Sequence, residues 1–134
     1  MKKYFFLLSL AVLFGASKCQ EDAGNTFDLG ETIMLKVGEM SKCNCKTIAV
    51  QFTGVTEDSR CPKNTNCVWA GEVKTKMDIN GQMYEMKLGG DSKEPASVEV
   101  DNFNVQLMEV SPYPEGGKKI DPADYVVKVV VMEK

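Results

Sequence analysis

The 134-residue sequence contains no histidine, a single tryptophan (Trp69) and a single arginine (Arg60). Because histidine is the only side chain whose ordinary pKa lies near neutrality, its absence excludes Ser-His-Asp and Cys-His catalysis and any zinc, copper or haem site that needs an imidazole ligand. No apolar run reaches the roughly 20 residues that a helix needs to cross a bilayer. Glycine (11) and proline (5) are too few for a collagen-like or low-complexity chain.

What is present is the composition of one small folded domain. Apolar residues make up 43% of the chain and charged residues 26%, and both fractions are close to the average for globular proteins. Acidic residues outnumber basic ones by 19 to 16, which gives a net charge of −3. Because an acidic surface repels phosphate backbones, we expect no nucleic-acid partner.

The first 18 residues have the layout of a signal peptide. Two lysines, Lys2 and Lys3, precede an eleven-residue run, 4–14, that consists almost entirely of Phe, Leu, Ala and Val. That length suits the apolar core of a secretory signal and is too short for a permanent transmembrane helix. We therefore predict an exported protein with a signal peptide over 1–18, whose mature chain is not an integral membrane protein.

Residues 15–19 read Gly-Ala-Ser-Lys-Cys and resemble the cleavage box at which bacterial lipoprotein precursors are diacylated and cut. Lys18 departs from that box, which prefers Gly or Ala at this position. The acidic run 20–22 resembles the tether of surface-directed lipoproteins of the Bacteroidetes group. The resemblance implies lipidation of Cys19, a tether over 19–26, and a cell-envelope protein held at the outer membrane by a lipid anchor alone. The alternative is that Cys19 belongs to an ordinary cleaved signal or pairs with another cysteine.

From residue 27 onward, apolar and polar residues alternate with a period of two, and no window shows the spacing of an amphipathic helix. Asn80-Gly81, between two such segments, is the sequence of a two-residue hairpin turn. These patterns predict an all-β domain over 27–134, a small two-sheet sandwich of immunoglobulin-like or Greek-key type with about seven strands. A closed barrel is the alternative. The alternating segments lie at 32–37, 47–52, 73–79, 83–88, 97–100, 103–110 and 125–132.

Residues 121–125, Asp-Pro-Ala-Asp-Tyr, resemble the Asp-x-Ala-x-Tyr tyrosine corner of immunoglobulin-like domains. The resemblance implies that the hydroxyl group of Tyr125 donates a hydrogen bond to the backbone of an upstream residue. Two residues after this tyrosine, where an immunoglobulin domain has a cysteine, the chain has Val127. We therefore do not expect a true immunoglobulin domain.

Four cysteines follow Cys19, and two of them flank a short polar turn. Disulfides are the usual state of an even set of cysteines in an exported protein. We expect Cys61 to pair with Cys67, because Pro62 and the polar residues after it form a tight turn that brings the two sulfurs together. A bridge of this size stabilises a fold by about 2–3 kcal/mol, so a purely structural role suffices for it.

Cys43 and Cys45 allow three interpretations. They could form a disulfide that stabilises a turn at Asn44, or a redox-active dithiol pair, or, together with Cys61 and Cys67, a four-sulfur metal site. An oxidising compartment favours the disulfide. The spacings are not those of zinc ribbons, and we expect neither a metal nor another cofactor.

Residues 55–62, Val-Thr-Glu-Asp-Ser-Arg-Cys-Pro, are followed at 67–72 by Cys-Val-Trp-Ala-Gly-Glu. Together with 110–114 (Val-Ser-Pro-Tyr-Pro) and 122–125 (Pro-Ala-Asp-Tyr), they resemble small uncharacterised exported proteins and lipoproteins of Bacteroidetes bacteria. The resemblance implies an all-β exported domain whose signature loop contains a Cys61–Cys67 bridge. It implies no activity.

The candidate binding residues are Asp58, Arg60 and Trp69, which flank this bridge in the sequence, and Tyr113 of the proline-rich loop further on. Arg60 could form an ion pair with Asp58, Glu57 or Glu72. Trp69 could pack on the disulfide as core tryptophans do in sandwiches. Such a cluster would brace the loop. Exposed Trp and Arg side chains would instead favour binding, because these residue types dominate the energy of interfaces.

Tyr113 stands between two prolines and is either a rigid aromatic tip or a lid over the end of the sandwich. The sequence offers no evident catalytic constellation. The leading hypothesis is therefore a non-enzymatic binding or structural module, tethered in the cell envelope, that presents the Cys61–Cys67 loop, alone or with the Pro112-Tyr113-Pro114 loop, to a protein or glycan partner. A protease inhibitor is a special case of this hypothesis. The alternatives are a thiol oxidoreductase that uses Cys43 and Cys45, and a carboxylate-based hydrolase that uses Asp121 and Asp124.

Overall fold

The structure is a computed structural model that describes residues 25–92 and 96–134. The predicted signal peptide, Cys19 and the tether up to residue 24 lie outside the described residues. The described part of the chain contains nine strands and one short 3-10 helix. These are β1 (Asn25–Phe27), β2 (Thr32–Lys36), β3 (Met40–Cys43), β4 (Ala49–Asp58), β5 (Glu72–Ile79), β6 (Gln82–Gly89), β7 (Ala96–Val100), β8 (Phe103–Ser111), η1 (Pro122–Asp124) and β9 (Val126–Glu133).

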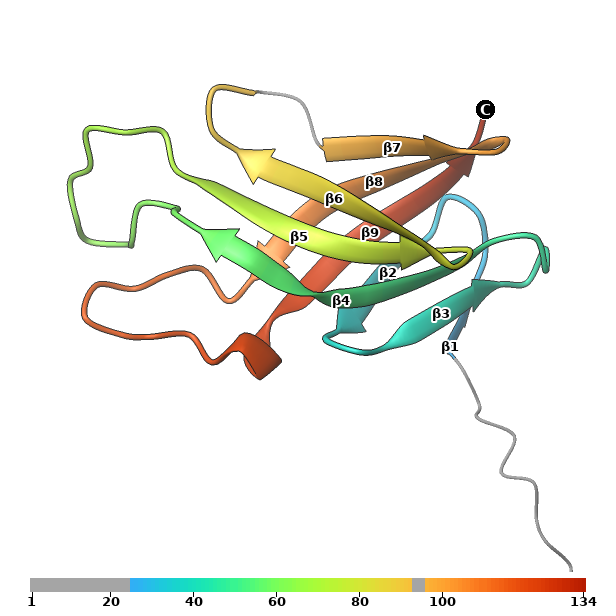
Figure 1. Ribbon diagram of the computed structural model, residues 1–134, viewed down its shortest axis with the longest axis horizontal. Coiled ribbons are helices and arrows are strands. Elements are labelled where there is room, and N and C mark those ends of the chain that lie inside the picture. The colour runs from blue at the N-terminus through green and yellow to red at the C-terminus, as the bar shows by residue number, and fades with distance from the viewer. Residues whose placement is uncertain (1–24, 93–95) are drawn as a thin grey trace, which may run out of the picture.

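The strands form two sheets, which confirms the predicted all-β sandwich (Figure 1). One sheet has five strands in the order β1-β3-β4-β5-β6, and the other has four in the order β2-β9-β8-β7. Only the β1–β3 pair is parallel among the described strands; the rest are antiparallel. The part of the chain that the structure describes contains no helix with the length and hydropathy needed to span a membrane.

The core lies between the two sheets and consists of the inward-facing residues of the alternating segments. In β5, for example, every second side chain is fully buried and the residues between them face outward, and the same holds for β9 as far as Val131. Thr75, which falls on the apolar side of its predicted segment, is also buried and donates a hydrogen bond to the carbonyl oxygen of Met86 (3.2 Å). The largest fully buried side chains are Phe27, Phe52, Leu35, Met77, Ile79 and Leu107.

Nine strands rather than about seven are present in the described residues, because two short strands were not predicted. β1 and β3 have three and four residues, too few for an alternating pattern to be recognised. In β3 the inward position is occupied by Ser41, which is 1% exposed and donates a hydrogen bond to the carbonyl oxygen of Asn25 (2.8 Å). Because this buried residue is polar, β3 lacks the alternation of apolar and polar residues by which a strand is predicted. β1 also takes up Asn25 and Thr26, which were expected to belong to the tether.

The Asn80-Gly81 turn between β5 and β6 is confirmed. Both residues have positive φ angles, 53° and 83°, as a type I′ hairpin requires. The side chain of Asn80 also ties this turn to the neighbouring strand: its Oδ1 accepts a hydrogen bond from the backbone N–H of Ala49 (2.8 Å), and its Nδ2 donates one to the carbonyl oxygen of Thr47 (3.2 Å).

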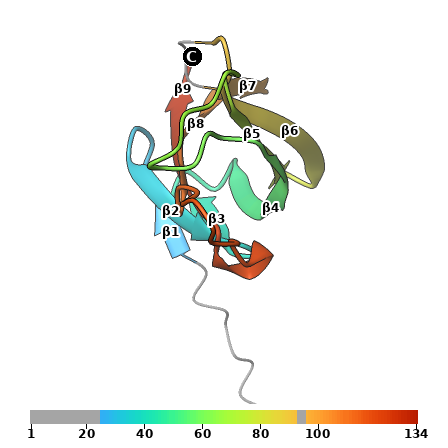
Figure 2. The same ribbon diagram turned by 90° about the vertical axis from the view of Figure 1, so that its left-hand side faces the viewer.

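Two long loops lie together at one end of the sandwich, on the left of Figure 1. They are the segment 59–71 between β4 and β5 and the segment 112–121 between β8 and η1 (Figures 1 and 2). Their backbones meet where the N–H of Lys63 donates to the carbonyl oxygen of Pro114 (2.9 Å). Strand β1, where the described chain begins, lies at the opposite end (Figure 1). The candidate site residues all belong to the loop end.

Candidate functional site

Arg60 is held by a two-pronged ion pair with Asp58. Its Nε donates to Oδ1 of the carboxylate (2.8 Å) and its Nη2 donates to Oδ2 (2.6 Å). The side chains are only 8% and 10% exposed, respectively. Of the three acidic partners considered from the sequence, the structure thus selects the nearest one. A bidentate pair of this kind fixes the direction of both side chains.

The remaining donors of Arg60 reach the other sheet. Nη1 donates to the carbonyl oxygen of Val110 (2.7 Å), near the end of β8, and Nη2 donates to the carbonyl oxygen of Pro112 (3.0 Å). Asp58 and Arg60 belong to β4 and the loop after it, so these bonds connect the two sheets at the loop end. All three guanidinium nitrogens are occupied. Arg60 is therefore a brace and is not exposed for binding.

Tyr125 adds a second connection between the sheets. It lies between η1 and β9, and its hydroxyl group donates to Oδ2 of Asp58 (3.0 Å). The expectation that this hydroxyl bonds to an upstream backbone group, as in a tyrosine corner, is wrong. A carboxylate from the other sheet takes the place of the backbone because Arg60 holds it within reach of the hydroxyl.

The shared hydrogen bonds shift the acidity of both groups. Burial disfavours the charged form of Asp58, but the hydrogen bonds and charge of Arg60 and the hydrogen bond from Tyr125 outweigh it and hold the pKa of this carboxyl below its ordinary value. Burial, and next the hydrogen bond to the Asp58 carboxylate, raise the pKa of Tyr125 to about 12. At neutral pH the cluster therefore consists of a carboxylate, a guanidinium and a neutral phenol.

The predicted Cys61–Cys67 disulfide is present, with a Cα–Cα distance of 5.9 Å. Inside the bridge, the Thr65 hydroxyl donates to the carbonyl oxygen of Pro62 (2.7 Å). Lys63 pairs in a parallel β-bridge with Glu115 of the other long loop. The loop 59–71, which contains this disulfide and which we call the stapled loop, is thus held both internally and by the neighbouring loop.

Gly71 closes the stapled loop at its return to β5. A Cβ atom at this position would lie 2.3 Å from the carbonyl oxygen of Ser59 and 2.5 Å from the Cα of Arg60. Real Cβ atoms do not come this close to backbone, so any other residue would push the two ends of the loop apart. Ser59 itself joins the ends, since its N–H donates to the carbonyl oxygen of Glu72 (2.8 Å).

Tyr113 covers the braced arginine. Its ring centroid lies 4.9 Å from the guanidinium carbon of Arg60 and 5.9 Å from Nζ of Lys63, both within range of a cation–π interaction. The side chain is 43% exposed. Of the two roles considered from the sequence, the structure supports the lid: one face of the ring packs on the brace and the rest faces solvent.

Trp69 does not pack in the core. The expectation that it packs as a core tryptophan is wrong, because the residue lies on the outside of the stapled loop and is 57% exposed. Its indole Nε1 donates to the carbonyl oxygen of Ser59 (3.1 Å), which fixes the ring to the base of the loop. The preceding residue, Val68, is fully exposed. We call Val68 and Trp69 the apolar tip.

Cys43 and Cys45 also form a disulfide, with a Cα–Cα distance of 5.0 Å. As expected, a turn at Asn44 makes this possible: the N–H of Lys46 donates to the carbonyl oxygen of Cys43 (2.8 Å), and Lys46 has a positive φ of 62°. Cys43 is buried and Cys45 is exposed. Because all four sulfurs are paired within their own turns, the four-sulfur metal site considered from the sequence does not form.

The structure uses Asp121 in a cap. Its carboxylate accepts a hydrogen bond from the backbone N–H of Ala123 (2.9 Å) and so caps η1. Asp124 joins the same turn through its own N–H, which donates to the backbone carbonyl of Asp121 (2.9 Å). Both residues therefore contribute to the local structure of the η1 turn.

Fold and site together define a small β-sandwich domain with a disulfide-stapled, arginine-braced loop that exposes an apolar tip. Comparison with known proteins finds no matching family, no matching curated protein and no matching solved structure. Two disulfides in one small domain are compatible with an oxidising, extracytoplasmic location. The sequence had indicated the residues of the brace and of the bridge. It gave no separate signal for Val68, whose exposure follows from the path of the loop.

Proposed function

We propose that this protein is an exported, lipid-tethered binding module without catalytic activity, and that it recognises a protein or glycan of the cell envelope through the apolar tip of its stapled loop. One observation carries the proposal: Val68 and Trp69 are exposed, 101% and 57%, on a loop whose base is held by a disulfide and a buried ion pair. Apolar side chains that are exposed next to one another often mark a protein interaction site.

The rigidity of the stapled loop supports the proposal that the loop binds a partner. A loop that is already ordered loses little conformational entropy on binding, so more of its contact energy appears as affinity. The indole ring of Trp69 is fixed by its hydrogen bond to Ser59, and tryptophan is among the residues that contribute most at interfaces. Inhibition of a protease by insertion of the stapled loop would be one form of such binding.

The direction of the loop also fits a tethered protein. In Figure 1 the described chain begins with β1 at one end of the sandwich, and the stapled loop lies at the other. A lipid on Cys19 would therefore attach the domain at the end opposite the apolar tip. The tip would then face away from the membrane surface and be accessible to partners in the envelope.

Site-specific photocrosslinking tests the proposal. A benzophenone amino acid replaces Val68 in one variant and Met83, which is 51% exposed on β6, in a matched control. In intact envelopes of a bacterium that makes the protein, we expect a discrete adduct from position 68 and none from position 83. Trp69→Ala should abolish the adduct while the melting temperature stays within a few degrees. Equal labelling from both positions, or no adduct from position 68, would contradict the proposal.

A second candidate function is thiol exchange at the Cys43–Cys45 bridge. It is favoured by one observation: the backbone N–H of Cys45 donates to Sγ of Cys43 (3.1 Å), while Cys45 is the exposed partner. An incoming thiolate would attack Sγ of Cys45 and form a new disulfide with it, and Cys43 would leave as a thiolate stabilised by that N–H. Reduced glutathione should then give a mixed disulfide at Cys45 alone. A bridge that stays oxidised in excess glutathione would remove this candidate.

A further inference from the structure

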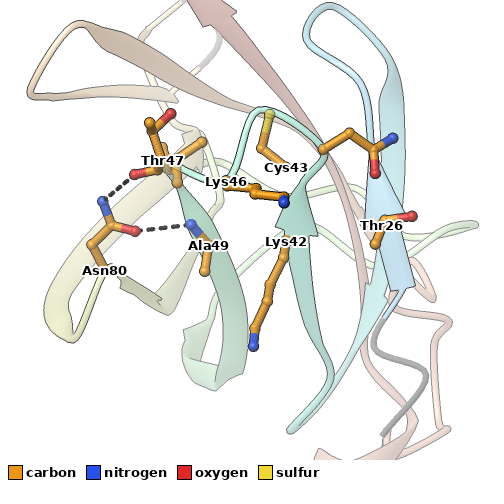
Figure 3. Close-up of a pocket in the computed structure, with 9 residues that line it drawn as sticks. Thr26, Lys42, Cys43, Lys46, Thr47, Ala49 and Asn80 are labelled. Atoms are coloured by element: carbon orange, nitrogen blue, oxygen red, sulfur yellow. Dashed lines mark hydrogen bonds between the residues drawn. The ribbon is translucent and has the colours of Figure 1, made fainter. Parts of the chain in front are cut away.

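A pocket of about 470 Å³ lies at the end of the sandwich opposite the stapled loop. Its walls come from neighbouring strands of the five-stranded sheet and from the turn that the Cys43–Cys45 bridge closes (Figure 3). Pockets of this volume are typical of small-molecule sites. The lining residues are Thr26, Lys42, Cys43, Asn44, Lys46, Thr47, Ile48, Ala49 and Asn80.

The turn that forms one wall is fixed on both sides. The backbone N–H of Asn44 donates to the carbonyl oxygen of Phe27 (2.9 Å), and its side-chain amide donates to Oδ1 of Asp28 (2.8 Å). On the other side, Asn80 binds the backbone of Thr47 and Ala49. The disulfide closes the turn between these two attachments. The pocket is therefore preformed and does not need a ligand to assemble it.

The charged groups that line the pocket are both cationic. Lys42, on the outer face of β3, and Lys46, in the turn, contribute ammonium groups, and neither makes a salt bridge to any described residue (Figure 3). No carboxylate is among the lining residues. Two nearby acidic residues make hydrogen bonds elsewhere. Asp28 accepts a hydrogen bond from the side-chain amide of Asn44, and Asp78 accepts one from the backbone N–H of Gly81 (2.8 Å).

We propose that this pocket binds a small organic anion, with a carboxylate or sulfonate head and an apolar body. The ammonium groups of Lys42 and Lys46, neither of which is in a salt bridge with a described residue, attract the head. Ala49 and the aliphatic parts of the two lysine side chains offer apolar contact for the body, above the buried side chains of Cys43 and Ile48. This site is separate from the apolar tip, so it stands whether or not the stapled loop binds a partner.

Amide chemical shifts of the ¹⁵N-labelled mature chain test the proposal. The probes are octanoate, 4-phenylbutyrate and 1-naphthalenesulfonate, and 4-phenylbutyramide is the uncharged control. We expect at least one anion to shift the amides of Thr26, Lys42, Lys46 and Thr47 in a saturable manner. The neutral amide should bind about tenfold more weakly, because it lacks the charge-assisted contacts. Raising the ionic strength should weaken binding of the anion but not of the amide.

Paired lysine variants provide the matched control. Lys42→Met with Lys46→Met removes both ammonium groups from the pocket and should weaken anion binding about tenfold. Lys76→Met with Lys87→Met removes the same charge from exposed positions on β5 and β6 and should leave it unchanged. The proposal is wrong if no anion gives saturable shifts at the pocket, if the amide binds equally well, or if both double variants lose affinity alike.

Discussion

At the scale of single residues, Arg60 shows how one side chain can serve both sheets. It binds the Asp58 carboxylate of the five-stranded sheet, the backbone carbonyl of Val110 in the opposite sheet and that of Pro112 in the loop after it, while nearly excluded from solvent. A charge in this position is tolerated because every donor nitrogen has an acceptor. The motif Asp58-Ser59-Arg60 therefore has a structural role, and the apolar tip that we propose as the binding surface lies elsewhere on the loop.

Removing the arginine should be costly because Asp58 would then be buried without a counter-ion. We expect Arg60→Met to lower the free energy of unfolding by about 3 kcal/mol. The control is Lys128→Met, which breaks the more exposed ion pair to Glu109 (2.7 Å) and should cost about 1 kcal/mol or less. Urea denaturation measures both. A loss at Arg60 no larger than the control would show that the ion pair does not brace the loop.

The raised pKa of Tyr125 predicts that the stability of the protein depends on pH. Its pKa is raised from 10.0 to about 12 in the folded protein, so the folded state favours the neutral phenol. The stabilisation is complete below pH 10 and is lost as the pH rises towards 12. Compared with Tyr125→Phe, the unmodified protein should therefore lose more stability over this range. Identical alkaline profiles for the two proteins would contradict the hydrogen bond to Asp58.

The lowered pKa of Asp58 predicts a loss of stability at acid pH. Because its pKa is lowered, its contribution is present above the ordinary value of 3.8 and is lost as the pH falls below it. Asp58→Asn should flatten the acid limb of the stability profile, measured by thermal unfolding between neutral pH and strongly acidic conditions. An unchanged acid limb would assign acid sensitivity to other carboxylates.

At the scale of elements, the stapled loop depends on its closing glycine. A methyl group at position 71 would overlap the carbonyl oxygen of Ser59, so Gly71→Ala should force the backbone apart and cost about 3 kcal/mol. Gly38→Ala is the control. Gly38, unlike Gly71, has a positive φ, 83°, but open space around it, and its substitution should cost only about 1 kcal/mol. A loss at Gly71 no larger than the loss at Gly38 would mean that the close contact with the Ser59 carbonyl does not explain this glycine.

The disulfide should order the loop more than it stabilises the fold. Cys61→Ser with Cys67→Ser is expected to cost about 2 kcal/mol, the amount that closing a loop of this length contributes. The larger effect should appear in backbone order parameters over 62–70, which should fall while those of β4 and β5 stay unchanged. If the loop keeps its order without the bridge, the brace alone defines its shape.

Much of the sandwich could be predicted because burial in a sheet leaves a direct trace in the sequence. In the long strand β5 the inward-facing residues alternate with charged ones along the sequence, and the Asn80-Gly81 turn has a backbone requirement that few other sequences meet. β1 and β3 are too short to show a period, and β3 buries a serine. Pairing with a partner strand, which sequence patterns do not record, defines these two strands.

The sequence was sufficient to predict which residues belong to the site, but not what each of their side chains contacts. Spacing was sufficient to pair Cys61 with Cys67 and to place Arg60 beside a carboxylate. Whether Trp69 faces the core or solvent depends on how the loop folds back, and the Tyr125 hydroxyl finds its acceptor 67 residues away. The lysine-lined pocket combines three strands and a turn, so only the folded chain shows it.

At the scale of the whole molecule, the proposed anchor can be tested directly. If the chain is a lipoprotein, the mature protein should begin at Cys19, carry a diacylglyceryl group there and partition into detergent. Cys19→Ala should release it into the soluble fraction with the fold unchanged. Mass spectrometry of the N-terminal peptide is the decisive measurement, and an unmodified peptide that contains Cys19 would contradict the anchor.

The order of strands in the four-stranded sheet has a consequence for how the chain is made. β2, near the start of the described chain, pairs only with β9, the last strand among the described residues, and β9 also separates β2 from β8. A chain emerging from its N-terminus cannot assemble this sheet until nearly all of it has been synthesised. The unfinished chain therefore lacks this sheet, and with it one wall of the core, until β9 has been made.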